Sequence, residues 1–179
     1  MVKIAIGAFL ICGALSFCAL PALSADDTAG HNKVVDELVK HWTTSKELSL
    51  AVANAMPEAD YSFKATAGEM SFGEQMNHIA AADSYYCSTA AGTKGPFKGK
   101  PADDSKSAAI KNLTVAYDYC IDSIKELSDA SLQKSIPTKS GSTTPFELFW
   151  GGFTHAAHHR GQAEVYLRLK GITPPEYKF

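Results

Sequence analysis

Four stretches of the chain place apolar residues three and four positions apart, with polar or charged residues between them. They span residues 31–56, 71–92, 104–129 and 144–170. This spacing puts the apolar side chains on one face of an α-helix. The pattern therefore predicts four amphipathic helices that pack their apolar faces together.

Residues that typically begin or end helices lie at the edges of these stretches. Pro57 follows the first stretch, and a proline ends a helix or lies just beyond its end. Ser71, with Glu74 three positions later, matches the capping box of a helix N-terminus. Pro145 stands in the first turn of the last stretch, and Gly171 stops it.

The connections between the predicted helices are polar and lack the alternation that is typical of strands. We expect loops over residues 57–70, 92–105 and 130–144. With no internal repeat and no interdomain linker, the sequence predicts an all-α fold, most simply a four-helix bundle.

Residues 1–24 differ from the rest of the chain. A short basic start precedes an almost wholly apolar run over residues 4–20, and small residues follow it. This order predicts a signal peptide that is cleaved after Ser24 or Ala25, with export to the periplasm or the cell exterior. An uncleaved membrane anchor is the alternative interpretation. No other segment is apolar enough to span a membrane.

Cleavage leaves residues 25–179 as one domain of ordinary globular composition. The full chain has 45% hydrophobic and 20% charged residues, with 17 basic and 19 acidic side chains. Its net charge of −2 becomes about −3 once Lys3 leaves with the signal peptide. Because no basic run occurs, nucleic acid is not an expected partner, and no membrane contact is expected after cleavage.

The exported domain keeps two of the four cysteines, Cys87 and Cys120, because Cys12 and Cys18 lie in the predicted signal peptide. An oxidising compartment permits a disulfide. A simple antiparallel pairing of the second and third helices, however, separates the two Cα atoms far beyond the roughly 7 Å limit for a disulfide. We therefore expect two buried free thiols, with a disulfide as the alternative.

The segment His155-Ala156-Ala157-His158-His159 carries the candidate chemistry. Residues four apart lie on one face of a helix, so His155 and His159 can point at one ion. His78, in the apolar stripe of the second predicted helix, is the candidate third ligand, because metal sites in bundles are built from facing helices. On spacing alone, ordinary surface or buried histidines are an equally good interpretation.

Three imidazoles suit a divalent ion such as zinc or nickel and leave at least one coordination position open. Such an ion lowers the pKa of its bound water toward 7. Other metal motifs do not fit. Ala156 occupies the place of the zincin glutamate, and neither Glu-x-x-His nor Cys-x-x-Cys-His occurs.

Two segments, HAAHHRGQAEVYLRLKGITPPEY at 155–177 and SFGEQMNHIAAADSYY at 71–86, resemble the DinB-like superfamily of metalloenzymes. The similarity covers essentially the whole exported domain, and HxxxHRGQ followed by YLRLKG is its most specific part. It implies a four-helix bundle in which His78, His155 and His159 bind a divalent metal. Some members are thiol S-transferases, others resemble metal-dependent hydrolases, and members often pair as homodimers.

Three neighbours of the predicted ligands carry further expectations. Glu74 lies one turn before His78 and could orient it or act as a catalytic base, although simple capping of the helix explains it as well. His158 is about 100° around the helix from His159, so we expect it at the surface or behind the ligands rather than on the ion. Gly151 and Gly152 indicate a kink, close helix packing or a locally weak helix.

The function that we predict is an exported DinB-like metalloprotein that acts as a hydrolase or group transferase on a small molecule, such as a thiol. One alternative is a non-enzymatic metal-binding or stress protein. Another is a bundle that binds partners and in which the histidines have no ligand role.

Overall fold

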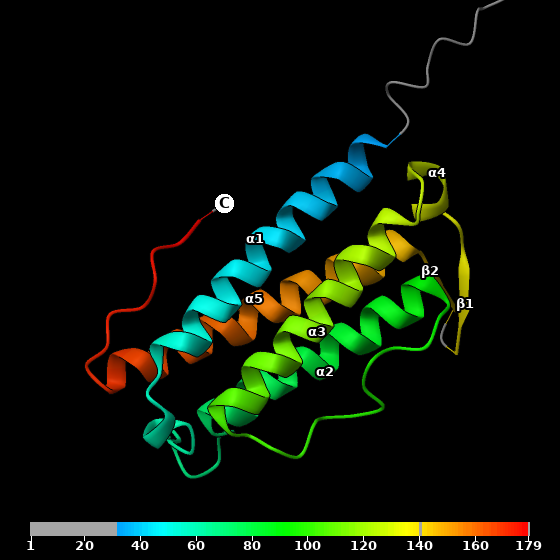
Figure 1. Ribbon diagram of the computed structural model, residues 1–179. Helices are drawn as coiled ribbons and strands as arrows, with labels where there is room; N and C mark the ends of the chain where they lie inside the picture. The colour runs from blue at the N-terminus through cyan, green and yellow to red at the C-terminus, as the bar shows by residue number, and fades with distance from the viewer. Residues whose placement is uncertain (1–31, 140, 179) are drawn as a thin grey trace, which may run out of the picture.

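Four long helices lie side by side in the computed structural model, which describes residues 32–139 and 141–178 (Figure 1). They are α1 (Lys33–Ala55), α2 (Phe72–Ala91), α3 (Lys106–Lys125) and α5 (Pro145–Leu169). Their apolar residues face inward and form one core. The predicted all-α four-helix bundle is therefore confirmed.

The predicted signal peptide, residues 1–24, lies outside the described residues, as do both cleavage positions and His31. The helices that are described contain no stretch both long enough and apolar enough to cross a bilayer.

Capping boxes fix the starts of α2 and α5. The Ser71 hydroxyl accepts from the Glu74 backbone N–H, and the Glu74 carboxylate accepts from the Ser71 N–H at 2.7 Å. Thr144 and Glu147 make the same reciprocal pair at the start of α5. Each box satisfies backbone donors that have no partner inside the helix. The capping box that the sequence predicted at Ser71 is thus confirmed.

The connections are more structured than the sequence indicated. Residues 130–144, expected to be a loop, overlap the short helix α4 (Asp129–Leu132) and contain a hairpin of β1 (Ile136–Thr138) and β2 (Gly141–Thr143). The strands pair antiparallel, with Ile136 opposite Thr143. Three-residue strands are too short to show an alternating pattern, so sequence reasoning missed them. The connection between α1 and α2 likewise contains a 3-10 turn, η2 (Glu58–Asp60).

α2 and α3 run in the same direction, because the connection between them returns along the bundle (Figure 1). Asn112 donates to Asn77 in the first halves of both helices, and Cys120 is bonded to Cys87 in their second halves. Residues 92–105 can cover this distance, because an extended chain spans about 3.3 Å per residue while a helix rises only about 1.5 Å. The bundle therefore contains a long crossover.

The expectation of two free thiols is wrong, because Cys87 and Cys120 form a disulfide between α2 and α3. Their Cα atoms lie 5.3 Å apart, and both side chains are fully buried. The prediction assumed that the two helices are antiparallel, which would place the cysteines at different levels. The parallel arrangement brings them to the same level.

The core is built around Trp42 of α1, which is completely buried. Its ring lies edge-on to Tyr117 of α3 at 5.8 Å and to Phe149 of α5 at 6.5 Å between centroids. Edge-to-face aromatic pairs at such distances add to the free energy gained by burying the rings. Trp42 therefore links three of the four long helices.

Gly151 and Gly152 let α5 approach α2 and α1 closely. A Cβ atom on Gly152 would lie 3.1 Å from the Tyr86 Cβ and 3.3 Å from the Trp42 ring, and one on Gly151 would lie 3.1 Å from the Tyr86 ring. α5 continues as a helix through both glycines. Of the interpretations offered by the sequence, close helix packing is the one that these contacts support.

The Gly152→Ala substitution is expected to lower the free energy of unfolding by about 1 kcal/mol. Overpacking a core costs roughly 1–3 kcal/mol, and replacing a helical glycine returns about 1 kcal/mol. Gly161→Ala, in the same helix with nothing within 4 Å of the added Cβ, should instead stabilise the protein by up to about 1 kcal/mol. Urea denaturation measures both. Equal effects at the two positions would contradict the packing explanation.

Replacing both cysteines by alanine should lower the free energy of unfolding by about 3–4 kcal/mol, because the disulfide closes a loop with a sequence separation of 33. Urea denaturation with and without a reductant measures this loss. The reductant should destabilise the native sequence and leave the double variant unchanged. Two titratable thiols in unreduced, unfolded protein would show that the disulfide is not formed.

Candidate metal centre

Three histidines from two helices meet at one place in the bundle. His78 comes from α2, and His155 and His159 come from successive turns of α5. Their candidate ligand atoms all lie within 4.8 Å of one another, and the ring centroids are 4.4–4.9 Å apart. These are the three residues that spacing and resemblance predicted, and the structure brings all of them together.

The histidine trio has the dimensions of a metal site. The Nε2 atoms of His78 and His155 lie 3.2 Å apart. Two nitrogens that share a tetrahedral ion, each at about 2.1 Å, lie about 3.4 Å apart. The wider limit of 4.8 Å for the whole group requires only small rotations of the rings. The trio could therefore hold a divalent ion.

Two glutamines hold His159 in the orientation that a ligand needs. Its Nδ1 lies 2.8 Å from the Gln75 Oε1 and 3.1 Å from the Gln162 Oε1. Because both oxygens only accept, Nδ1 carries the proton and donates it, which leaves the Nε2 lone pair free. Partners of this kind fix the tautomer and the ring orientation of metal-binding histidines.

Gln75 was missed by sequence reasoning. Gln75 is almost completely buried, with 1% of its surface exposed, and its amide donates to Gln162 at 3.1 Å. The available signal was a symmetrical spacing: Gln75 stands three residues before His78, and Gln162 stands three residues after His159.

His155 is held differently. Its Nδ1 is buried and has no hydrogen-bond partner among the described residues, while its Nε2 faces His78. The ring of Tyr86 lies 6.1 Å away. On its Nδ1 side, therefore, packing rather than hydrogen bonding positions this imidazole.

Burial keeps all three imidazoles neutral. Loss of solvent, followed by the charges of the neighbouring histidines, lowers the pKa of His159 from 6.5 to about 4, and the hydrogen bond with Gln162 opposes part of this fall. Burial also lowers the pKa values of His78 and His155. Neutral imidazole is the form that binds a metal. The trio is therefore in its ligand form near pH 7.

Glu74, the predicted base, is engaged by other groups. Its carboxylate caps α2 at Ser71 and lies 3.4 Å from the ammonium groups of both Lys64 and Lys100. The Ser71 backbone hydrogen bond, followed by the lysines, lowers its pKa from 4.5 to about 2. A carboxylate with so low a pKa is a weak base. A catalytic role for Glu74 stays a prediction.

His158 lies outside the trio, as the rotation of the helix predicted. Its side chain is exposed, and its Nε2 lies 3.0 Å from the amide nitrogen of Gln162. It therefore touches the partner of His159 rather than the centre of the trio.

Comparison with known proteins identifies similar sequences and folds. The profile described as the DinB family matches residues 28–179. A crystal structure of a DinB-like protein from Bacillus cereus ATCC 10987 has a TM-score of 0.70 at 19% identity, covering 80% of this chain and 97% of its own. A DinB-like protein from Bacillus subtilis has a TM-score of 0.66 at 20% identity, covering 79% of this chain and 96% of its own. No curated protein is similar enough in sequence to count as a match.

The metal-free protein should lose stability as the pH falls from about 6.5 toward 4. In that window the histidines of the unfolded chain take up protons while His159, with a pKa of about 4, stays neutral in the fold. The unfolded state then binds more protons and is favoured. Urea denaturation across this range should show a shallower decline for His159→Gln. Identical pH profiles would contradict the burial effect.

Proposed function

The chain belongs to the DinB family. We propose that it is an exported metalloenzyme. It binds a divalent ion, zinc or nickel, through His78, His155 and His159. It uses that ion for hydrolysis or for transfer of a group to or from a small molecule such as a thiol. The observation that carries the proposal is the convergence of three neutral imidazoles from two facing helices.

The donor set of the trio supports catalytic rather than purely structural binding. Three nitrogen ligands leave the fourth coordination position of a tetrahedral ion open for water or substrate. Catalytic zinc sites have this arrangement. A bound divalent ion supplies Lewis-acid polarisation of a substrate and lowers the pKa of a group that it binds. Gln75 and Gln162 contribute by keeping the proton of His159 on Nδ1.

Lys100 supports an anionic or polarised substrate group at the site. Its positive charge acts on His78 and, after burial, is the second cause of the lowered pKa of that histidine. Lys100 also pairs with Glu74 and Asp104, and the part of its charge that reaches His78 favours negative charge beside the trio. A thiolate substrate and a developing oxyanion both carry negative charge. Lys100 therefore supports a transferase that acts on a thiol as well as a hydrolase.

Export is supported by the disulfide between Cys87 and Cys120, because such bonds persist mainly in oxidising compartments. Pairing as a homodimer is supported by an exposed aromatic residue on α5. Trp150 is 54% exposed and stacks between Phe146 and Phe153.

A non-enzymatic metal-binding protein is the second candidate. The observation that favours it is the state of Glu74, whose carboxylate already accepts from Ser71 and pairs with Lys64 and Lys100. With Glu74 engaged in this way, an ion held by the trio would be stored rather than used.

The proposal is tested by titrating purified metal-free protein with zinc and with nickel against a competing chelator. We expect one ion per chain and a loss of at least about 100-fold in affinity for His155→Ala. Gln75→Ala should weaken binding by about 10–100-fold, as is usual when the partner of a ligand is removed. His158→Ala, the matched control from the same turn, should change affinity by less than about threefold.

Activity is tested on the loaded protein with thiol-transfer and ester or amide substrates. Turnover that disappears in His78→Ala and persists in His158→Ala supports the enzyme. Tight metal binding without turnover favours the second candidate. Equal affinity in the native protein and His155→Ala would remove the metal site altogether.

A further inference from the structure

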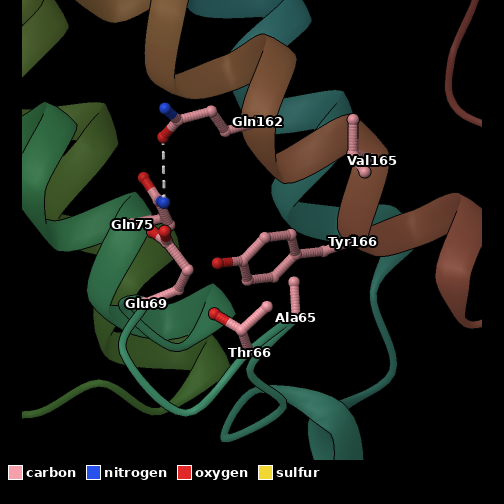
Figure 2. A pocket seen from close by; sticks show the side chains of 7 residues that line it. All are labelled: Ala65, Thr66, Glu69, Gln75, Gln162, Val165 and Tyr166. Atoms are coloured by element: carbon pink, nitrogen blue, oxygen red, sulfur yellow. Dashed lines mark hydrogen bonds between the residues drawn. The ribbon is translucent and has the colours of Figure 1, made fainter.

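A cavity of about 280 Å³ lies between α2, α5 and the segment before α2, and Gln75 and Gln162, the partners of His159, form part of its wall. Figure 2 shows side chains from these three parts of the chain around it. Gln75 comes from α2, Gln162 and Tyr166 come from α5, and Glu69 comes from the preceding segment. Sites for drug-sized molecules usually occupy about 300–1,000 Å³, so this cavity, just below that range, suits only a smaller molecule.

The cavity carries one charged side chain. Glu69, an exposed residue at the rim, is its only carboxylate, and no ion-pair partner for it occurs among residues 32–139 and 141–178. The neighbouring acids differ, because Glu74 pairs with two lysines and Glu164 pairs with Arg168. An unbalanced carboxylate beside a concave surface attracts a cation and disfavours an anion.

The remaining walls are apolar or neutral. Ala65, Val165 and the ring of Tyr166 supply apolar surface, while the Tyr166 hydroxyl already donates to the Met70 carbonyl at 2.9 Å. Val165 is 50% exposed at the edge of the cavity. The walls therefore suit a short hydrocarbon body.

The two glutamines connect this cavity to the trio. Gln75 and Gln162 line the cavity with part of each side chain and accept from His159 Nδ1 with their oxygens. A ligand that displaces either amide must change the hydrogen bonds of His159. Gln75 and Gln162 therefore offer a physical connection between an occupant of the cavity and His159.

We propose that this cavity is a binding site for a small organic cation, a primary ammonium group on a short apolar chain. The ammonium group pairs with Glu69, and the chain lies against Val165 and Tyr166. Through Gln75 and Gln162, the bound ligand alters the environment of His159. The proposal goes beyond the metal chemistry and does not require it.

The test uses n-butylammonium, with n-butanol and butyrate as probes of similar size and different charge. Metal-free protein is titrated with each, and binding is followed by NMR of the Ala65 and Val165 methyl groups and the side-chain amides of the two glutamines. We expect butylammonium to bind at least fivefold more tightly than butanol, and butyrate to bind most weakly. The His159 ring resonance should shift with butylammonium.

Matched variants distinguish the contribution of the Glu69 charge to binding from that of the cavity shape. Glu69→Gln should reduce the preference for butylammonium over butanol to less than twofold, whereas Glu126→Gln, an exposed glutamate outside the cavity, should keep it. Val165→Trp covers the edge of the cavity and should abolish binding of all three probes.

Equal affinity for the three probes, an unchanged preference in Glu69→Gln, or resonance changes confined to other surfaces would overturn the proposal. An unmoved His159 resonance at saturation would overturn the link to the trio. Because every measurement uses metal-free protein, these results are independent of whether the proposed metal chemistry succeeds.

Discussion

The close approach of α5 to α2 at Gly151 and Gly152 is the constraint on which the rest of the site depends. With no side chain at these positions, the helix backbone rests against Tyr86 and Trp42. His155 and His159 follow within the next two turns and therefore stay close enough to α2 for their rings to meet His78. A larger residue at Gly152 would push α5 away from α2 just before His155 and His159, and their imidazoles would move with it. The same helix contact therefore determines both the packing of the core and the geometry of the three histidines.

Buried polar side chains connect α1, α3 and α5 through hydrogen bonds, and Asp83 of α2 lies within the electrostatic influence of Arg160, although neither of its carboxylate oxygens has a hydrogen-bond partner among the described residues. The Tyr117 hydroxyl of α3 contacts Ser45 and Ser49 of α1, and Arg160 of α5 donates to Ser45. Asp83 of α2 is completely buried, which raises its pKa well above the ordinary value, while the charge of Arg160 opposes that rise. Such groups cost free energy unless they are paired. Arg160 follows His159 directly, so the interactions that hold its guanidinium inside the bundle also restrict rotation of the α5 segment that carries the ligands.

The parts of the structure that could be predicted are those with a local signal. The helices follow from the spacing of apolar residues, and the start of α2 follows from Ser71 and Glu74. The trio follows from two histidines four residues apart on one helix and a third on the apolar face of another. The disulfide could not be predicted, because it depends on the direction of α3, and a polar connection of this length is compatible with either direction. Gln75 was missed for a similar reason. A glutamine has no distinguishing pattern until the fold places His159 against it.

The electrostatic setting of the trio bears on what a bound ion could do. Neutral imidazoles donate electrons but no charge, so an ion that they hold keeps its full positive charge. Glu74, one turn before His78, is a carboxylate that could offset this charge, yet Lys64 and Lys100 both pair with it. A structural site is stabilised when thiolates or carboxylates neutralise its ion. Here the ligands are neutral, and the carboxylate of Glu74 is paired with lysines instead. The charge that remains would be met most readily by an anionic ligand at the open position, which argues for exchangeable chemistry at the trio rather than permanent closure.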